Sequence, residues 1–291
     1  MFQGVYTALI TPFADDESVD EGALRALVDM QIDRGISGLV PVGTTGESPT
    51  VTHDENIRIV EIVVKQAAGR VPVIAGTGSN STQEAVDMTR RARDIGATAT
   101  LQVAPYYNKP NAEGFFRHFT RVAEEGGLPI VVYNIPGRTG KNIDNATMLR
   151  LAEHPQIVAV KEASGDLAQV MDLVLRKPKD FVVLSGDDNL AVPITLLGGA
   201  GVVSVASNLI PDLMTEMITS ALAGRLKDAL GLHYRLLPFF QALFMDTNPI
   251  PVKYAMHRAG YCRDVYRLPM VPLAHDLREK LHGVLAECGI A

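Results

Sequence analysis

One lysine stands inside an apolar strand pattern, where a charged side chain is unexpected. The run Ile157–Ala163 contains Lys161, whereas the other eight lysines fall on expected helices or loops. Period-2 alternation places the Lys161 side chain opposite Val158 and Val160, so it points into a barrel if these valines face outer helices. Burial disfavours the charged amine, and lowering its pKa from about 10.4 to about 7.5 corresponds to roughly 4 kcal/mol. The neutral amine could attack a carbonyl and form a Schiff base.

Lys161 also has a less reactive interpretation. The lysine could pair with Glu162 or another neighbouring carboxylate, or extend its amine to the rim of the sheet. Its position on an expected barrel strand favours the catalytic interpretation, because reactive groups in parallel barrels gather where the strands end.

Two other strand ends carry groups that could assist a Schiff-base lysine. Tyr133 ends the preceding strand, and its phenol could move protons during carbinolamine formation and dehydration. A core tyrosine with a satisfied hydroxyl is the alternative. The turn Gly43–Gly46 offers backbone N–H groups and the hydroxyls of Thr44 and Thr45, which together suit a carboxylate.

Further polar and aromatic residues follow the expected strands. Arg138 could hold a substrate carboxylate through two hydrogen bonds, unless it is a solvated loop arginine. Tyr106 and Tyr107 form an aromatic pair in a loop, which is typical of a subunit contact. Neither His53 nor Cys262 has a partner for a nucleophilic triad, and the seven histidines lack metal-ligand spacing. We therefore expect no metal and no cofactor.

The elements that must position these groups alternate along the chain. Short β-branched runs predict strands at Gly4–Pro12, Gly38–Gly43, Val71–Gly76, Thr98–Ala104, Pro129–Ile135, Ile157–Ala163, Phe181–Ser185 and Gly201–Ala206. Helical periodicity predicts helices between them at Glu21–Arg34, Asp54–Ala68, Thr82–Ile95, Glu113–Glu124, Ala146–Glu153, Leu167–Arg176, Leu190–Leu197 and Asp212–Ala223. Strands alternating with helices imply right-handed crossovers and a parallel sheet. Eight such units favour an α/β fold, the (β/α)8 TIM barrel.

Local signals agree with these bounds. Thr52 and Ser81 are each followed three residues later by a glutamate, Glu55 and Glu84, which is the pattern of a capping box. Glycines stand at three expected helix ends: Gly35, Gly69 and Gly96. An open doubly wound sheet is the alternative fold, but no G-x-G-x-x-G follows the first strand.

Strand signals stop after residue 224. We therefore expect a catalytic barrel over residues 1–224 and a C-terminal helical region over residues 225–291 packed against it. Helices of that region are expected at Gly224–Met245, Ile250–Gly260 and Ala274–Glu287.

Composition excludes several classes of protein. The 291 residues are 47% hydrophobic, which is too apolar for a disordered chain. The net charge of 27 − 33 = −6 argues against nucleic-acid binding, and no apolar run approaches the ~20 residues of a membrane span. The N-terminus lacks the pattern of a secretory signal, and two cysteines make a disulfide framework implausible. A cytoplasmic protein with no nucleic-acid or membrane partner is the expectation.

Six segments carry a family resemblance and run almost from end to end of the chain: Thr7–Phe13, Gly43–Glu47, Ala75–Asn80, Tyr133–Gly140, Val160–Ser164 and Asn248–Lys253. Together they resemble the dihydrodipicolinate synthase (4-hydroxy-tetrahydrodipicolinate synthase) family of the class I pyruvate-dependent aldolase superfamily. The resemblance implies condensation of pyruvate with L-aspartate 4-semialdehyde, in lysine (diaminopimelate) biosynthesis. It also implies a homotetramer built as a dimer of dimers.

The resemblance implies a role for each matching residue. Lys161 would form the Schiff base with pyruvate. A proton relay would consist of Tyr133, Thr44 and Tyr107, the last reaching into the site of a neighbouring subunit. Four residues would bind the substrates: Thr45, Arg138, Gly186 and Val203.

A second, regulatory site is also implied. Five residues match positions that contact inhibitory L-lysine in bacterial members: Ser48, His53, Asn80, Glu84 and Tyr106. Position 49 is Pro49, and position 56 is Asn56, where sensitive members often carry histidine. We expect lysine inhibition that is retained but weakened.

Two rival functions remain. An N-acetylneuraminate or 2-keto-3-deoxy sugar acid lyase of the same superfamily would share the barrel, Lys161 and Tyr133. Thr44, where sialate lyases typically have serine, and Arg138, which sugar lyases usually lack, favour the synthase. A catalytically silent barrel is the other rival, and the intact set of reactive residues argues against it.

Overall fold

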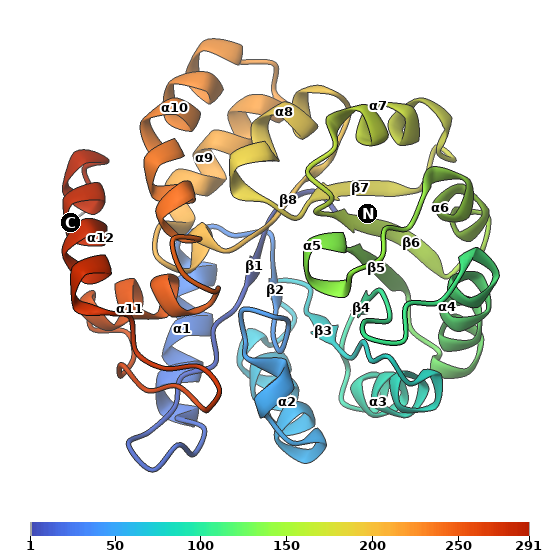
Figure 1. Ribbon diagram of the computed structural model, residues 1–291, viewed down its shortest axis with the longest axis horizontal. Coiled ribbons are helices and arrows are strands. Elements are labelled where there is room, and N and C mark those ends of the chain that lie inside the picture. Colours follow the sequence, from blue (N-terminus) through green and yellow to red (C-terminus); the bar gives the residue numbers. More distant parts are fainter. Residues whose placement is uncertain (1, 291) are drawn as a thin grey trace.

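The computed structural model describes residues 2–290, which form the predicted (β/α)8 barrel (Figure 1). Within that range eight parallel strands lie in the order β2-β1-β8-β7-β6-β5-β4-β3. A parallel bridge between Leu39 and Val73 joins the two ends of this order and nearly closes the ring. The strands are β1 (Gly4–Ala8), β2 (Gly38–Val40), β3 (Ile74–Gly76), β4 (Ala99–Val103), β5 (Ile130–Asn134), β6 (Ile157–Glu162), β7 (Val182–Ser185) and β8 (Gly201–Ser204).

Helices follow the strands and cover the outside of the ring (Figure 1). Those of the barrel are α1 (Glu21–Asp33), α2 (His53–Ala67), α3 (Thr82–Asp94), α4 (Ala112–Gly126), α5 (Pro136–Thr139), α6 (Asn145–Ala152), α7 (Leu167–Arg176), α8 (Ala191–Leu196) and α9 (Pro211–Leu222). Short 3₁₀ helices span Ser48–Thr50, Asp188–Leu190 and Ala206–Asn208. The chain then continues through α10 (Leu226–Ala242), α11 (Ile250–Arg258) and α12 (His275–Glu287), which lie on one side of the barrel.

Apolar side chains pack in two layers. Inside the ring, residues such as Tyr6, Val40, Leu101 and Val131 form one buried cluster. Between the strands and the helices, alternate strand residues such as Val160 pack against the helices. Because strand neighbours point to opposite faces, each strand contributes to both layers and buries a continuous apolar run.

Several strand bounds and one capping box differ from the sequence-based expectations. The first strand ends at Ala8 rather than at Pro12, and the second ends at Val40 rather than at Gly43. The third begins at Ile74 rather than at Val71, and the proline at 72 lacks the N–H that a ladder requires. The Thr52 capping box is confirmed, but the one predicted at Ser81 is wrong in one half. Ser81 accepts from the Glu84 N–H, whereas the Glu84 carboxylate turns to Ser79 and His53 instead of capping back.

No helix within residues 2–290 has the length and apolar character needed to cross a membrane.

Candidate active site

Lys161 and Tyr133 are register partners on the neighbouring strands β6 and β5. Both side chains are buried, and the Lys161 Nζ lies 4.2 Å from the centroid of the Tyr133 ring. Val160 packs outward as predicted, but the prediction for Val158 is wrong, because it packs against the inner cluster. A bulge causes this difference: Ile130 pairs with Ile157 and Val131 with Ala159, so Val158 is an extra residue.

The environment of Lys161 favours its neutral amine. Burial lowers its pKa to about 8, and the nearby Arg138 acts in the same direction, while Asp187 and Asp188 raise it. The Glu162 carboxylate does not pair with Lys161: it accepts hydrogen bonds from the Asn134 side chain and the Ser164 N–H. Within residues 2–290 no ion pair holds Lys161. At neutral pH the amine is therefore still mostly protonated, but a far larger fraction of it is neutral and reactive than for an ordinary lysine.

Tyr133 is held as a protonated phenol. Burial and the Asp187 carboxylate raise the pKa of Tyr133, while Arg138 and the Thr44 hydroxyl act in the opposite direction. A phenol that remains protonated beside an amine can donate a proton to the oxygen that leaves a carbinolamine.

The turn after β2 carries Thr44 and Thr45 in a strained backbone. Val42 and Glu47, on either side, have φ of 55° and 56°, and such left-handed conformations cost about 1–3 kcal/mol each for residues other than glycine. The buried Thr45 Oγ1 accepts a hydrogen bond of 3.1 Å from Asn248 Nδ2. The Thr45 O–H is thus free to donate to a ligand carboxylate.

Arg138 lies on the short helix α5, an element that the sequence did not predict. Its side chain is exposed, and one Nη donates to the Asn248 backbone oxygen at 3.3 Å. Asn248 therefore touches both residues that are proposed to bind carboxylates, Thr45 and Arg138. It was missed as a site residue, although it opens the Asn248–Lys253 segment of the family resemblance.

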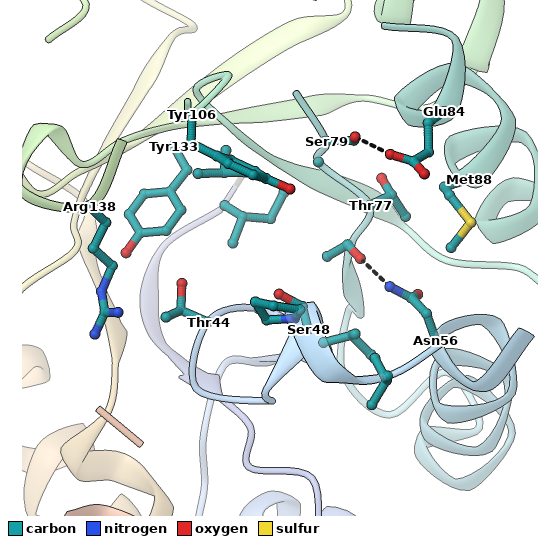
Figure 2. Close-up of a pocket in the computed structure, with 18 of the residues that line it drawn as sticks. Thr44, Ser48, Asn56, Thr77, Ser79, Glu84, Met88, Tyr106, Tyr133 and Arg138 are labelled. Carbon is teal, nitrogen blue, oxygen red and sulfur yellow. Dashed lines mark hydrogen bonds between the residues drawn. The ribbon is translucent and has the colours of Figure 1, made fainter. Parts of the chain in front are cut away.

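A cavity of about 420 Å³ opens beside these groups. Figure 2 shows Thr44, Tyr133 and Arg138 together at one side of it. The Lys161 Nζ lies over the Tyr133 ring, but Lys161 is not itself among the residues that line the cavity. Gly186 is packed against the lysine, since a Cβ there would stand 3.2 Å from Lys161 Cε.

Besides Lys161, four of the predicted catalytic and substrate-binding residues do not line this cavity: Thr45, Gly186, Val203 and Tyr107. Val203 is fully buried in the inner cluster and does not line it. Tyr107 is 91% exposed with φ of 69°, and the structure does not bring it to Lys161 of the same chain. Its neighbour Tyr106 does line the cavity.

The same cavity is also lined by most of the predicted lysine-binding set. Ser48, His53, Glu84 and Tyr106 line it, and His53 Nε2 lies 2.8 Å from Glu84 Oε1. Asn80 lies just outside, where its Nδ2 donates to the Tyr106 carbonyl at 3.2 Å. Figure 2 shows Glu84, Ser79, Met88 and Asn56 on the side across from Arg138.

No group of three or more histidine, cysteine, aspartate or glutamate side chains suited to a metal ion occurs in the described part of the chain.

The fold and these groups define a class of protein. At the carboxyl ends of the barrel strands, a buried lysine with a lowered pKa lies beside a phenol. This is the arrangement of a barrel enzyme that activates carbonyl compounds as Schiff bases. Residues 1–288 match the model of the dihydrodipicolinate synthetase family, and the chain belongs to that family.

Individual relatives agree with this assignment over the whole chain. The 4-hydroxy-tetrahydrodipicolinate synthase of Maridesulfovibrio salexigens is 49% identical over 290 residues, which cover 99% of each chain. The chloride-inhibited dihydrodipicolinate synthase of Acinetobacter baumannii, solved with pyruvate, superposes with a TM-score of 0.98 at 41% identity, covering 100% of both chains. The enzyme of Cyanidioschyzon merolae, solved with lysine bound, has a TM-score of 0.97 at 40% identity and covers 100% of this chain and 99% of that one.

Proposed function

We propose that this chain is a 4-hydroxy-tetrahydrodipicolinate synthase, which condenses pyruvate with L-aspartate 4-semialdehyde through a Schiff base on Lys161. The observation that carries the proposal is the buried lysine of lowered pKa beside Tyr133. The identity of 49% to a synthase over the full chain supports the same reaction, and the Acinetobacter complex supports pyruvate as the first substrate.

The reaction follows from the chemistry of the residues. The neutral Lys161 amine adds to the pyruvate carbonyl, and the carbinolamine loses water to give an iminium. The Tyr133 phenol, with Thr44 beside it, donates and takes back the protons of these steps. The positive iminium nitrogen acidifies the pyruvate methyl group, so proton loss gives an enamine that attacks the aldehyde carbon. The substrate's own amine then attacks the imine carbon, closes the ring and expels Lys161 as a free amine.

The carboxylates of the two substrates need separate partners. The Thr45 hydroxyl is free to donate to the pyruvate carboxylate, and Gly186 leaves the space that the Lys161 side chain occupies. Val203 supports this interior from within the barrel core. The Arg138 guanidinium, at the open side of the cavity, holds the carboxylate of the semialdehyde.

The assembly completes the relay in this proposal. Tyr107 is almost fully exposed beside the half-exposed Tyr106, which suits burial against a second copy of the chain. We propose a homotetramer, a dimer of dimers, in which Tyr107 reaches the neighbouring site. A cytoplasmic location is part of the same proposal and fits the two free cysteines, Cys262 and Cys288.

Turnover of pyruvate with L-aspartate 4-semialdehyde tests the function directly. We expect loss of both substrates at equal rates, and no cleavage of N-acetylneuraminate or of 2-keto-3-deoxy sugar acids. Sugar acid cleavage without condensation would replace the synthase with the rival lyase. Failure of pyruvate to leave an adduct after borohydride reduction would leave only the silent barrel.

The lowered pKa of Lys161 predicts the pH dependence of Schiff-base formation. Below its pKa of about 8 the amine is protonated and cannot attack, so the rate with limiting pyruvate should fall about tenfold per pH unit below that value and level off above it. The rate of adduct formation under borohydride, followed from about pH 6 to about pH 9, measures this. A flat profile over that range would show that the amine is neutral throughout and that the pKa is lower.

The cavity residues that match the lysine-binding positions of the family lead us to expect binding of L-lysine. His53, Glu84 and Tyr106 offer a carboxylate and hydrogen-bonding groups to its ammonium groups, and the Cyanidioschyzon structure contains lysine. We expect inhibition at millimolar L-lysine, and we expect Glu84→Gln to weaken it about tenfold, because one charged partner is lost. Activity measured against L-lysine, with D-lysine as the control ligand, tests this. Activity that stays unchanged in millimolar L-lysine would contradict a working regulatory site.

A further inference from the structure

A buried ion pair joins the C-terminal helices to the turn that carries Thr44 and Thr45. Lys253, on α11, places its Nζ 2.5 Å from Glu47 Oε1. Both side chains are buried, at 0% and 1% exposed, although the two residues are 206 positions apart in the sequence. The ammonium group also lies 4.1 Å from the centroid of the Phe13 ring and 5.1 Å from that of Tyr266.

Stability alone is a weak explanation for such a pair. Removing two charges from water costs free energy that their attraction barely recovers, so apolar replacements of similar size are often neutral or stabilising. An ion pair at the surface, such as Lys65 with Glu61, keeps most of its contact with water and avoids this desolvation cost. We therefore expect the Glu47–Lys253 pair to have a role other than stabilising the fold.

The position of Glu47 indicates that role. It ends the turn of residues 42–47 in a left-handed conformation, and Val42 begins the turn in another. Strained backbones of this kind persist only where surrounding contacts hold them. Within the turn, the Glu47 N–H donates to the Thr44 carbonyl at 3.1 Å, so a shift of Glu47 moves Thr44 directly.

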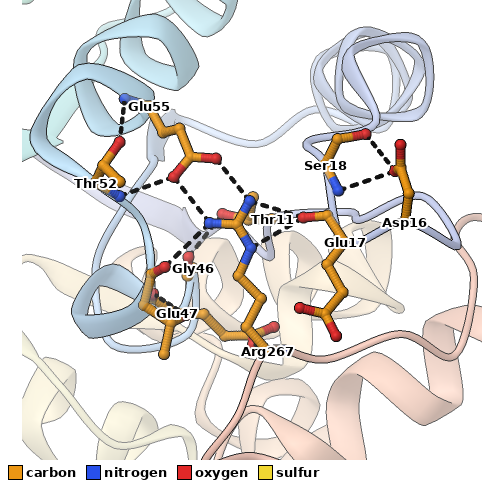
Figure 3. Close-up of polar contacts among 10 residues, drawn as sticks. Thr11, Asp16, Glu17, Ser18, Gly46, Glu47, Thr52, Glu55 and Arg267 are labelled. Atoms are coloured by element: carbon orange, nitrogen blue, oxygen red, sulfur yellow. Dashed lines mark hydrogen bonds and ion pairs between the residues drawn. The ribbon is translucent and has the colours of Figure 1, made fainter.

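Further contacts from the C-terminal segment hold the same turn. The second Glu47 carboxylate oxygen accepts from the Arg267 N–H at 3.4 Å. The Arg267 side chain donates to the Thr50 carbonyl at 3.0 Å. It also binds both carboxylate oxygens of Glu55, as Figure 3 shows. Asn248, five residues before Lys253, binds the Thr45 hydroxyl. Of the two ion pairs in this set, Glu47–Lys253 is the fully buried one, and it fixes the end of the strained turn.

We propose that Lys253 and Glu47 are positioning residues for the pyruvate site: their ion pair holds the turn of residues 42–47 so that Thr44 stays beside Tyr133 and Thr45 faces the pyruvate carboxylate. The inference rests on the proposed function for the roles of Thr44 and Thr45. Neither residue of the pair touches the reacting atoms, and both act through the turn.

The double variant Glu47→Leu/Lys253→Met tests this by replacing the pair with apolar groups of similar size. We expect it to fold and to have a melting temperature close to that of the wild type. The pyruvate concentration that half-saturates the rate of borohydride trapping should rise about tenfold, and kcat for condensation should fall about tenfold. Arg278→Met is the matched control, because Arg278 pairs with Asp264 in the same C-terminal segment and makes no hydrogen bond to residues 42–47 among the described residues. That control should change the melting temperature but not the half-saturating pyruvate concentration.

Glu47→Gln covers the case in which the double variant does not fold. The amide keeps a hydrogen-bond acceptor for Lys253 but leaves its buried charge uncompensated, so the melting temperature should fall and half-saturating pyruvate should rise about threefold. Wild-type half-saturation in whichever of these variants is folded would overturn the proposal, as would an equal rise in Arg278→Met. Wild-type enzyme that is trapped by pyruvate but does not condense it with the semialdehyde would overturn the proposed function alone.

Discussion

Lys161→Ala is expected to abolish the adduct that borohydride traps with pyruvate and to lower kcat for condensation by at least about 10⁴-fold. The described structure offers no replacement nucleophile, because the other fully buried lysine, Lys253, is paired with Glu47. Intact-mass measurement after pyruvate and borohydride treatment gives the extent of trapping. The fold should persist, because the substitution removes a costly buried amine from an otherwise apolar barrel interior.

Two controls separate loss of the nucleophile from loss of the fold. Lys161→Arg keeps a cation but has no nucleophilic amine, so it should also fail to form the adduct. Lys65→Ala removes an exposed lysine that pairs only with Glu61 in the described structure, and it should trap pyruvate normally. Residual adduct in Lys161→Ala, located by peptide mapping at another lysine, would show that the Schiff base forms elsewhere.

The fold was largely predictable because each strand is buried on both faces. Such strands appear in the sequence as short β-branched runs, and glycines or capping residues separate them from the helices. The predicted order of strands and helices is confirmed except for one added helix. The short helix α5 was missed because a single turn at Pro136–Thr139 is too short to show helical periodicity.

The inward direction of the Lys161 side chain could be predicted correctly from the position of Val160 but not from that of Val158. Val160 gives the correct alternation, whereas Val158 is itself the extra residue of a bulge that leaves no mark in the sequence. Tyr133 and Lys161 were brought together by their places on consecutive strands, which pair directly in a parallel barrel.

Contacts that join distant parts of the chain could not be predicted. Asn248 meets Thr45 across 203 positions, and Lys253 meets Glu47 across 206, with no periodic signal to relate them. The same limit explains the incomplete capping box at Ser81. The Glu84 carboxylate has a competing partner, His53 of another helix, and this contact outside the local sequence decides its direction.

Tyr133→Phe is expected to lower kcat by about 10²–10⁴-fold while the protein stays folded. The phenyl ring keeps the packing of the buried side chain and its contact with the Lys161 amine, which lies 4.2 Å from the ring centroid. Only the hydroxyl is lost, and with it the protonated phenol that burial maintains by raising its pKa. Schiff-base formation should be slowed because the carbinolamine oxygen must leave without that proton donor. Single-turnover kinetics of trapping, together with steady-state kcat, measure both effects.

Tyr6→Phe is the matched control for this prediction. Tyr6 belongs to the same interior cluster, and burial raises its pKa to about 12, but it packs edge-on against Phe2, which precedes the first strand. It pairs with Gly38, the first residue of β2, whereas Lys161 and Tyr133 meet near the carboxyl ends of β6 and β5. Tyr6→Phe should keep wild-type rates of trapping and turnover. An equal loss of activity in Tyr6→Phe and Tyr133→Phe would mean that removal of either buried hydroxyl disturbs the packing of the barrel interior. Normal trapping rates in Tyr133→Phe would instead assign the proton transfer to Thr44 or to solvent and remove Tyr133 from the mechanism.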